Sequence, residues 1–322
     1  MYSRQILFGL AETHAATDFL YCYRPHRFFR SFREHIARNA HRRLLLKGHS
    51  VSADLFHGLN QRIDSTRYQR TVSTFHDLFV LSGDYSTADF RRKFAQQAHE
   101  AAQRSNLIIA VSNFTARQIQ ELLKVEPARI RVIPHGVRRP PNLSARREKM
   151  ILFVGAIQRR KNVTRLVEAF ANVPSGWKLV LAGSLGYAAQ ETINGIANSA
   201  RKDDIRVLGY VPGDTLEDLF ARASIVAFPS LDEGFGMPVL DAMAHGIPVL
   251  TSNVSALPEV SGDAALLVDP TDVASIADGL CRLIGDESLR TKLAQAGLER
   301  SSEFSWERAV QATWKVYQEL LS

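Results

Sequence analysis

The chain contains little cysteine and no long apolar run. Its two cysteines, Cys22 and Cys281, are too few for a disulfide framework or a cysteine-based metal site, and they fit a reducing cytoplasm. No run of about 18 apolar residues is present, so the sequence predicts no membrane-spanning helix. The apolar stretch within residues 1–12 is also too short for a signal peptide. We therefore expect a cytoplasmic protein, and 45% hydrophobic with 23% charged residues is typical of a folded one.

Basic residues outnumber acidic ones in this chain, and the excess of basic residues is confined to one segment. Residues 24–47 hold seven arginines and Lys47 against one glutamate, which gives this segment a net charge of +7. The remaining residues hold 32 basic and 32 acidic side chains, so the segment accounts for the whole net charge of the chain. So local an excess argues for a local surface and against general nucleic-acid binding. On a helical wheel, apolar side chains fall on one side of this segment and arginines on the other: Phe29, Phe32, Ile36, Ala40 and Leu44 oppose Arg27, Arg30, Arg38 and Arg42.

Two interpretations of residues 24–47 stay open. A basic amphipathic helix suits the interface of an anionic membrane, which predicts a peripheral protein on the inner face of the membrane. Alternatively, this is a surface helix packed on its own domain, because Arg33 and Arg43 interrupt the apolar side.

The length of 322 residues predicts two domains of ordinary size. The one linker-like stretch is 138–144, with adjacent prolines, and it places the boundary near residue 140. We expect strands at 18–23, 53–57, 71–76, 107–111 and 130–133, then at 150–155, 178–182, 205–208, 224–228 and 247–250. Helices are expected at 2–12, 88–104, 113–123, 163–170, from 238, over 272–300 and at 306–321. This alternation predicts an α/β protein with doubly wound parallel sheets.

A loop and helix after the strand at 224–228 form the most informative stretch. Glu233 to Gly236 lie at the carboxyl end of that strand, and Pro238 suits the first position of the following helix. Open α/β sheets bind ligands at this edge, and the glycines let N–H groups approach an anion at the helix N-terminus. Glu233 and Asp241, which we place in the first helical turn, suit hydroxyl groups. The alternative is a strand-loop-helix corner with acids that cap the helix.

Two further groups lie at strand ends. Arg159, Arg160 and Lys161 stand between a strand and a helix N-terminus, where guanidinium and ammonium groups suit a diphosphate. The alternative is a solvated basic loop. His76 and Asp77 end the strand at 71–76, although a histidine there is as often structural as functional.

Several motifs occur in order along the chain. They are Val154-Gly155, Arg160-Lys161-Asn162, Gly209-Tyr-Val-Pro212, Glu233-Gly-Phe-Gly-Met-Pro238 with Asp241, Gly246-Ile-Pro-Val249 and Leu257-Pro-Glu259, and in the first half His57-Gly58, His76-Asp77, Val111-Ser-Asn-Phe114 and Val132-Ile-Pro-His-Gly136. With these motifs the chain resembles the retaining glycosyltransferases of family 4 (group 1), which have the GT-B fold. The match is specific over 150–322 and looser before it.

The resemblance implies two Rossmann-like domains that face a cleft: residues 1–140 with the crossing helix 306–322, and residues 141–305. The first domain would take the acceptor. The second would bind a nucleotide-sugar donor, with no metal or other cofactor. The resemblance also assigns the site residues. Glu233 would hold a donor sugar hydroxyl, and His76 would lie near the sugar and acceptor. Arg160 and Lys161 would balance the diphosphate, and the amides of Gly234, Phe235 and Gly236 would meet sugar and phosphates. Asp241 would hold the ribose, and Val211 would lie by the base.

The chain departs from the family in three ways. Asp241 stands where the family usually has glutamate, and Ala156 where it often has arginine. The third departure is larger: the first domain lacks the strand and glycine-bearing loop that precede the helix matched by residues 2–12. Losing that strand would expose the edges of its two neighbours. Either the true start lies upstream, or this is a natural truncation.

The leading hypothesis is therefore a hexosyltransferase that acts on a glycan or lipid-linked acceptor in surface polysaccharide synthesis. The motif at 160–162 with His76 and Asp77 favours mannosyl- or rhamnosyl-type enzymes and GDP-mannose as donor. The alternative is a truncated, non-catalytic relative that binds a nucleotide-sugar or a membrane. A GT-B epimerase or phosphorylase fits the spacing of acids and bases less well.

Overall fold

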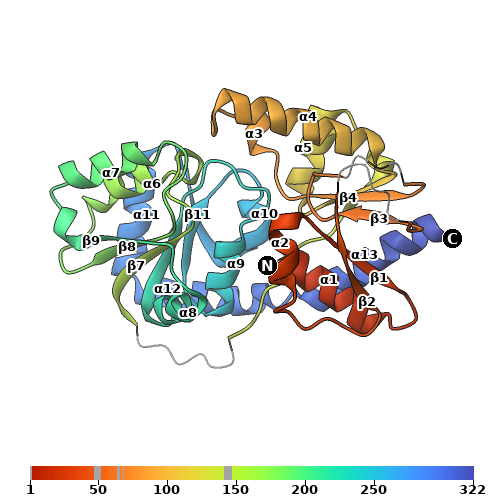
Figure 1. The fold of residues 1–322 in the computed structure, drawn as a ribbon. Coiled ribbons are helices and arrows are strands. Elements are labelled where there is room, and N and C mark those ends of the chain that lie inside the picture. Colours follow the sequence, from red (N-terminus) through yellow and green to blue (C-terminus); the bar gives the residue numbers. More distant parts are fainter. Residues whose placement is uncertain (1, 47–51, 64–65, 67, 141–146) are drawn as a thin grey trace. The chain divides into compact units, whose positions relative to one another are not determined.

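The computed structural model describes residues 2–46, 52–63, 66, 68–140 and 147–322. These form two compact units, drawn in Figure 1. The first unit comprises Met1–His76, Arg92–Gly136 and Ser305–Ser322, and the second comprises Asp77–Arg91 and Val137–Phe304. The predicted α/β architecture with parallel strands is confirmed in both units, because every paired strand is parallel to its neighbour.

The described residues of the first unit carry two separate parallel sheets. One pairs β1 with β2, and the other has the order β3-β4-β5-β6. The strands are β1 (Phe19–Tyr23), β2 (Ala40–Leu44), β3 (Phe56–Gly58), β4 (Thr71–Phe75), β5 (Leu107–Ala110) and β6 (Ile130–Val132). The helices are α1 (Tyr2–Thr13), α2 (Pro25–Ser31), α4 (Ala88–Arg104, whose first turn belongs to the second unit), α5 (Asn113–Leu123) and α13 (Trp306–Leu321). Among these residues, β1 and β3 each have one strand neighbour, so each has an unpaired edge.

Local signals in the first unit explain several element ends. Ser112 caps α5 by accepting a hydrogen bond from the Thr115 amide at 3.0 Å. The final helix, α13, belongs to the first unit although the chain reaches it from the second. Helix α13 packs on α1. Helix α1 is also held by β1, because the Tyr21 hydroxyl donates to the Leu7 carbonyl at 2.5 Å.

The prediction of one long amphipathic helix over residues 24–44 is wrong. The segment contains the short helix α2, a loop and the strand β2. Asn39 ends the loop and donates to the carbonyls of Ala11, His14 and Thr17 at 2.8–3.1 Å. Beyond it, Ala40 to Leu44 pair with β1 over five residues. Backbone pairing therefore outweighed the 3.6-residue period of the side chains, because short apolar patterns do not separate helix from strand. Lys47 lies outside the described residues.

The second unit is built on a six-stranded parallel sheet in the order β12-β11-β10-β7-β8-β9. Its strands are β7 (Glu148–Val154), β8 (Lys178–Ala182), β9 (Ile205–Gly209), β10 (Ala223–Phe228), β11 (Val249–Ser252) and β12 (Ala265–Val268). Its helices are α3 (Phe79–Ser82), α6 (Val163–Phe170), α7 (Ala189–Asn198), α8 (Gly213–Arg222), α9 (Met237–Ala244), α10 (Leu257–Ser261), α11 (Val273–Gly285) and α12 (Glu287–Ser301). Helices α7 and α8 were not predicted.

The order of strands creates a switch point between β7 and β10. The chain runs from β7 outward through β8 and β9, and then crosses back to β10 on the other side of β7. Helices α6 and α11 pack together, as do α9 and α12, and the helices lie on both faces of the sheet (Figure 1). Buried side chains of β7 and β10, such as Phe153 and Phe228 with stacked rings 5.8 Å apart, fill the core. A switch point is where such sheets bind ligands.

Candidate active site at the switch point

Two loops meet at the carboxyl ends of β7 and β10. The first carries Arg160 and Lys161 in a short 3-10 turn, and the second carries Ser230 to Gly236. They are joined directly, because the Leu231 amide and the Ser230 hydroxyl both donate to the Arg160 carbonyl, at 2.8 and 3.2 Å. The predicted basic pair and the predicted acid are thus brought together by the topology of the sheet.

A buried cluster of opposite charges lies between these loops. The carboxylate of Glu233 is 2.9 Å from Nη1 of Arg160 and 2.5 Å from Nζ of Lys161. The Ser230 hydroxyl donates to the same carboxylate at 2.6 Å. All three charged residues are less than 10% exposed. The interpretation of Arg160 and Lys161 as a solvated basic loop is therefore wrong.

The electrostatics of the cluster keep Glu233 ionised. Burial alone would raise the pKa of Glu233, but Lys161 and Arg160 outweigh burial and lower that pKa below its usual value. Burial lowers the pKa of Lys161, and Glu233 opposes the fall. For Arg160, burial would lower the pKa, but the neighbouring carboxylates raise it. Arg160 and Lys161 therefore lie buried among three carboxylates, those of Glu233, Asp77 and Asp232, and the two cations are the groups of this site that suit a diphosphate.

Aromatic rings hold both cations independently of Glu233. The Arg160 guanidinium lies 4.1 Å from the ring centre of Phe79, and the Lys161 ammonium lies 4.8 Å from that of Phe228. Next in sequence, Asn162 adopts a left-handed conformation with φ 59° and donates to the carbonyls of Pro229 and Pro270 at 2.9 and 2.6 Å. Asn162 thereby fixes the turn that carries the two cations. The sequence motif Arg160-Lys161-Asn162 contains this residue, but the motif alone assigns it no role in the site.

Backbone geometry explains two glycines at the ligand edge. Gly236 has φ of +112°, and a Cβ there would lie 2.7 Å from Cδ2 of Leu257. A Cβ on Gly183, after β8, would lie 1.8 Å from the carbonyl oxygen of Gly155. Phe235 is buried, with its ring edge-on to Phe304 at 5.9 Å, and Gly234 precedes it in the same loop. The loop amides that we expect to contact a sugar and phosphates therefore lie directly before α9, in a loop that the buried Phe235 side chain holds in place.

Sequence reasoning missed two polar residues of this site, Ser82 and Asp232. Ser82 of α3 donates to the carboxylate of Asp232 at 2.6 Å, and the Asp232 carbonyl accepts a hydrogen bond from Arg160. Burial raises the pKa of Asp77 to about 6, while Arg160 lowers it and Glu233 raises it. The sequence places Asp77 at a strand end, but it does not predict that Asp77 lies near Arg160 and Glu233 in the second unit. These neighbours are far from Asp77 in the sequence.

Asp241 lies on α9 and Val211 follows β9, so neither belongs to the two loops that carry the charge cluster. Asp241 is the fifth residue of α9, so its predicted place in the first turn is wrong: the helix starts at Met237, one residue before the proline. Burial raises the pKa of Asp241 to about 7, with Glu217 raising it further and His245 lowering it. Val211 follows β9 and packs partly buried on the core of the second unit.

His76 belongs to the first unit and ends β4. Its Nε2 is 2.9 Å from the Leu59 carbonyl, and its Nδ1 is 3.3 Å from Nε2 of His135. The Tyr2 ring lies edge-on to His76 at 4.5 Å. Burial lowers the pKa of His76, so the imidazole is neutral at neutral pH.

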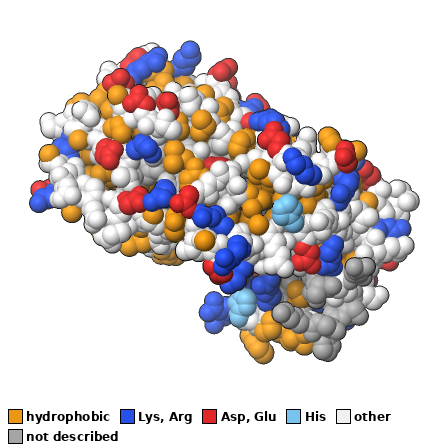
Figure 2. Space-filling model, turned by 90° about the horizontal axis from the view of Figure 1, so that it is seen from above, with side chains coloured by type: hydrophobic (Ala, Val, Ile, Leu, Met, Phe, Trp, Pro, Cys, Tyr) orange, Lys and Arg blue, Asp and Glu red, His pale blue; other side chains and the backbone are white. Residues whose placement is uncertain are grey.

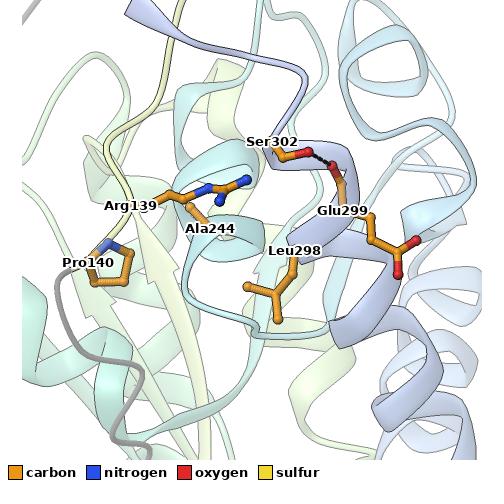
Figure 3. Close-up of a pocket in the computed structure, with 6 residues that line it drawn as sticks. All are labelled: Arg139, Pro140, Ala244, Leu298, Glu299 and Ser302. Carbon is orange, nitrogen blue, oxygen red and sulfur yellow. Dashed lines mark hydrogen bonds between the residues drawn. The ribbon is translucent and has the colours of Figure 1, made fainter.

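One pocket lies at the C-terminal end of α9, opposite the end that follows the loop Ser230 to Gly236. It has a volume of about 360 Å³ in the second unit, and the Arg139 side chain extends beside Ala244 and Ser302 there (Figure 3). Its lining is Arg139, Pro140, Ala244, Leu298, Glu299 and Ser302, which includes none of the predicted site residues. Across the described ranges, no group of three or more histidine, cysteine, aspartate or glutamate side chains is arranged for a metal ion. None of the described helices is long and apolar enough to span a bilayer.

Comparisons with known proteins cover almost the whole chain. The family described as "Glycosyl transferases group 1" matches residues 137–300, and "Glycosyltransferase Family 4" matches residues 12–139. The O-antigen chain mannosyltransferase B of Escherichia coli is 33% identical over 281 residues, which cover 82% of this chain and 74% of that protein.

Two solved structures share the fold over nearly their whole length. WaaG, a glycosyltransferase involved in lipopolysaccharide biosynthesis, has a TM-score of 0.74 at 15% identity, with 98% of this chain and 95% of that chain covered. The Anabaena protein HepE in complex with UDP and glucose has a TM-score of 0.76 at 16% identity, with the same coverage. The predicted GT-B fold is confirmed.

Proposed function

Because this chain belongs to the group 1 glycosyltransferases of family 4, we propose that it transfers a hexose from a nucleotide-sugar to a glycan or lipid-linked acceptor in surface polysaccharide synthesis. The observation that carries the proposal is the buried cluster of Arg160, Lys161 and Glu233 at the switch point of the second unit. Two fixed cations beside a glycine-bearing loop suit a diphosphate, and the carboxylate between them suits a sugar hydroxyl.

The reaction proceeds on one face of the sugar. The acceptor oxygen forms a bond to the anomeric carbon while the bond from that carbon to the phosphate oxygen breaks, and the departing phosphate takes the acceptor proton. Arg160 and Lys161 stabilise the negative charge that develops on the diphosphate. Glu233 accepts a hydrogen bond from a sugar hydroxyl, and the amides around Gly234 to Gly236 bind the sugar and phosphates. No side-chain nucleophile is required, and neither is a metal.

The remaining predicted residues orient the substrates. Asp241 accepts hydrogen bonds from the ribose hydroxyls, and Val211 contacts the base. His76, neutral and fixed by the Leu59 carbonyl, interacts with the sugar and acceptor. Residues 1–140 with 306–322 act as the acceptor domain, and residues 141–305 as the donor domain.

Mannose from GDP-mannose is the donor group that we propose. Support comes from the resemblance of the O-antigen mannosyltransferase B over most of this chain. Uridine nucleotides are the competing class, because a fold relative binds UDP and glucose. We further propose that the enzyme works on the inner face of an anionic membrane, which it contacts through residues 24–47.

The donor class is tested by thermal stabilisation with GDP, UDP, ADP and dTDP. A ligand that binds only the folded state raises the free energy of unfolding by about 2.7 kcal/mol at a hundredfold excess over its dissociation constant. We expect the largest shift with GDP, followed by transfer of labelled mannose from GDP-mannose to membrane extracts. Glu233→Ala should lose about 10²–10³-fold in transfer, whereas Glu168→Ala, at an exposed position on α6, should match the wild type. Wild-type transfer by Glu233→Ala would refute the site assignment.

A further inference from the structure

Helix α2 and the residue after it expose two phenylalanine side chains. Phe29 is 81% exposed and Phe32 is 61% exposed, which makes Phe29 among the most exposed large hydrophobic residues described in the chain. Both rings pack edge-on against Phe28, with ring centres 5.8 and 5.3 Å away. Figure 2 shows hydrophobic side chains beside lysine or arginine and histidine side chains at the lower end of the view. Neighbouring exposed aromatic rings mark an interaction surface rather than scattered surface residues.

The charges around this aromatic pair have one sign. Residues 24–43 contain seven arginines and a single acid, Glu34, which is only partly exposed. The exposed arginines of α2 and the following loop are Arg24, Arg27, Arg30, Arg33 and Arg38. A surface of this composition is complementary to a dense array of negative charge, and its aromatic side chains favour an apolar layer beneath that charge.

The surface is held in shape by hydrogen bonds from neighbouring strand β2. Arg42 donates to the Ser31 carbonyl at 3.0 Å and to the Glu34 carbonyl, and its guanidinium lies 5.0 Å from the ring centre of Phe32. These contacts tie the loop after α2 back to the sheet. The aromatic pair is therefore presented on a preformed support, which limits the entropy lost on docking.

We propose that Phe29 and Phe32, surrounded by the arginines of α2 and its loop, form a docking surface for an anionic lipid bilayer. This deepens the membrane part of the proposed function and does not depend on which nucleotide-sugar is used. The two rings enter the boundary between headgroups and acyl chains, and the arginines bind lipid phosphates. Docking brings the enzyme to lipid-linked acceptors.

The test is co-sedimentation of the full chain with vesicles of phosphatidylglycerol and phosphatidylcholine, compared with phosphatidylcholine alone. We expect binding to the anionic vesicles that weakens with salt. Phe29→Ala with Phe32→Ala should reduce the affinity at least tenfold, because the main apolar contacts are lost. The matched control is Val207→Ala with Leu208→Ala, which removes exposed apolar side chains from β9 of the second unit.

A second variant tests the charges. Each basic residue near an anionic surface contributes about 1 kcal/mol, or roughly a fivefold factor in affinity. Reversing Arg27, Arg30 and Arg33 to glutamate should therefore lower the affinity by at least about a hundredfold. The control is the reversal of Lys149, Lys202 and Arg206, three exposed basic residues of the second unit. An unchanged nucleotide-induced melting shift in each variant shows that the chain still folds.

Three results would overturn this inference: no binding of the wild type to anionic vesicles, equal binding to neutral vesicles, or wild-type binding by the phenylalanine variant. Self-association that requires Phe29 and Phe32 would instead assign the surface to a second copy of the chain. The proposed function fails separately, because transfer to a soluble acceptor glycan needs no vesicles. A docking variant should retain that transfer and lose transfer to vesicle-bound acceptors.

Discussion

Glu233→Gln should make the protein less stable and yet bind nucleoside diphosphates more tightly. In the ligand-free site the Glu233 carboxylate is the counterion of Arg160 and Lys161, at 2.9 and 2.5 Å. Glutamine keeps the size of the side chain but removes its charge, so two buried cations lose the carboxylate that contacts both of them, while Asp77 and Asp232 remain near Arg160. Removing one partner of a buried ion pair typically destabilises by about 3–5 kcal/mol. For a domain of this size, that lowers the melting temperature by roughly 10 °C.

The same substitution removes the anion with which a diphosphate must compete. One unit charge at about 4 Å contributes up to about 4 kcal/mol at the effective dielectric constant of such sites. A gain of at least about tenfold in GDP affinity is a conservative expectation. Affinity for the complete nucleotide-sugar should rise less, because its sugar loses the carboxylate, and transfer should fall as for Glu233→Ala.

Isothermal calorimetry and thermal unfolding measure both effects, with Glu168→Gln on the exposed face of α6 as control. The pH dependence supplies an internal check. Because the pKa of Glu233 is lowered in the folded state, its contribution to stability is present above pH about 4.5 and is lost as pH falls through the folded pKa. Glu233→Gln should lack this loss. A variant that melts like the wild type and binds GDP no better would refute the counterion argument.

Three other outcomes follow from the geometry. The pKa of His57 is lowered to about 3, first by burial and then by His76, while an unfolded histidine titrates near 6.5. The unfolded state therefore binds more protons, so stability of the first unit should fall as pH drops from about 7 toward 3, and His57→Asn should flatten the melting curve against pH. Burial raises the pKa of Asp241 to about 7, so the fraction of Asp241 that is ionised should increase from pH 6 to pH 8. The affinity for GDP, measured by calorimetry, should increase over the same range. In Asp241→Asn this increase should be absent. Gly236→Ala should reduce the free energy of unfolding by about 2 kcal/mol or more, because φ is +112° and the new Cβ would lie 2.7 Å from Leu257. Gly176→Ala is the control, because Gly176 has φ +82° but no atom within 4 Å of a new Cβ, so that this variant reports the backbone strain alone.

Much of the second unit could be predicted from the sequence because its signals are local. Apolar runs bounded by glycine placed β7 and β8, and the stretch Val163–Phe170 matched α6. The rule that ligands bind at strand carboxyl ends then predicts that Glu233 and Arg160 lie at one edge of the sheet. Here each signal lies within about ten residues of the element it predicts.

The first unit was harder because its decisive contacts are distant in sequence. The side-chain period of residues 24–44 fits a helix, yet pairing of β2 with β1 and the three hydrogen bonds from Asn39 override it. Likewise, nothing near Asp77 and Ser82 in the sequence indicates that they face Arg160 and Asp232. Propensity patterns report on neighbours in the chain and therefore miss contacts of this kind.

The supports of the two cations in the charge cluster also bear on how the proposed donor would bind. If Arg160 and Lys161 were held only by Glu233, then a carboxylate that turned toward a sugar hydroxyl would release both cations. Each cation instead has a second support: the Phe79 ring and the Asp232 carbonyl for Arg160, and the Phe228 ring for Lys161. Under the proposed function, the positive charges are therefore already fixed when the donor binds, and its diphosphate would replace one anion by another at a preorganised site. It follows that Phe79→Leu should weaken transition-state stabilisation more than it weakens GDP binding, since a mobile guanidinium still attracts a diphosphate but no longer meets the developing charge in a fixed position.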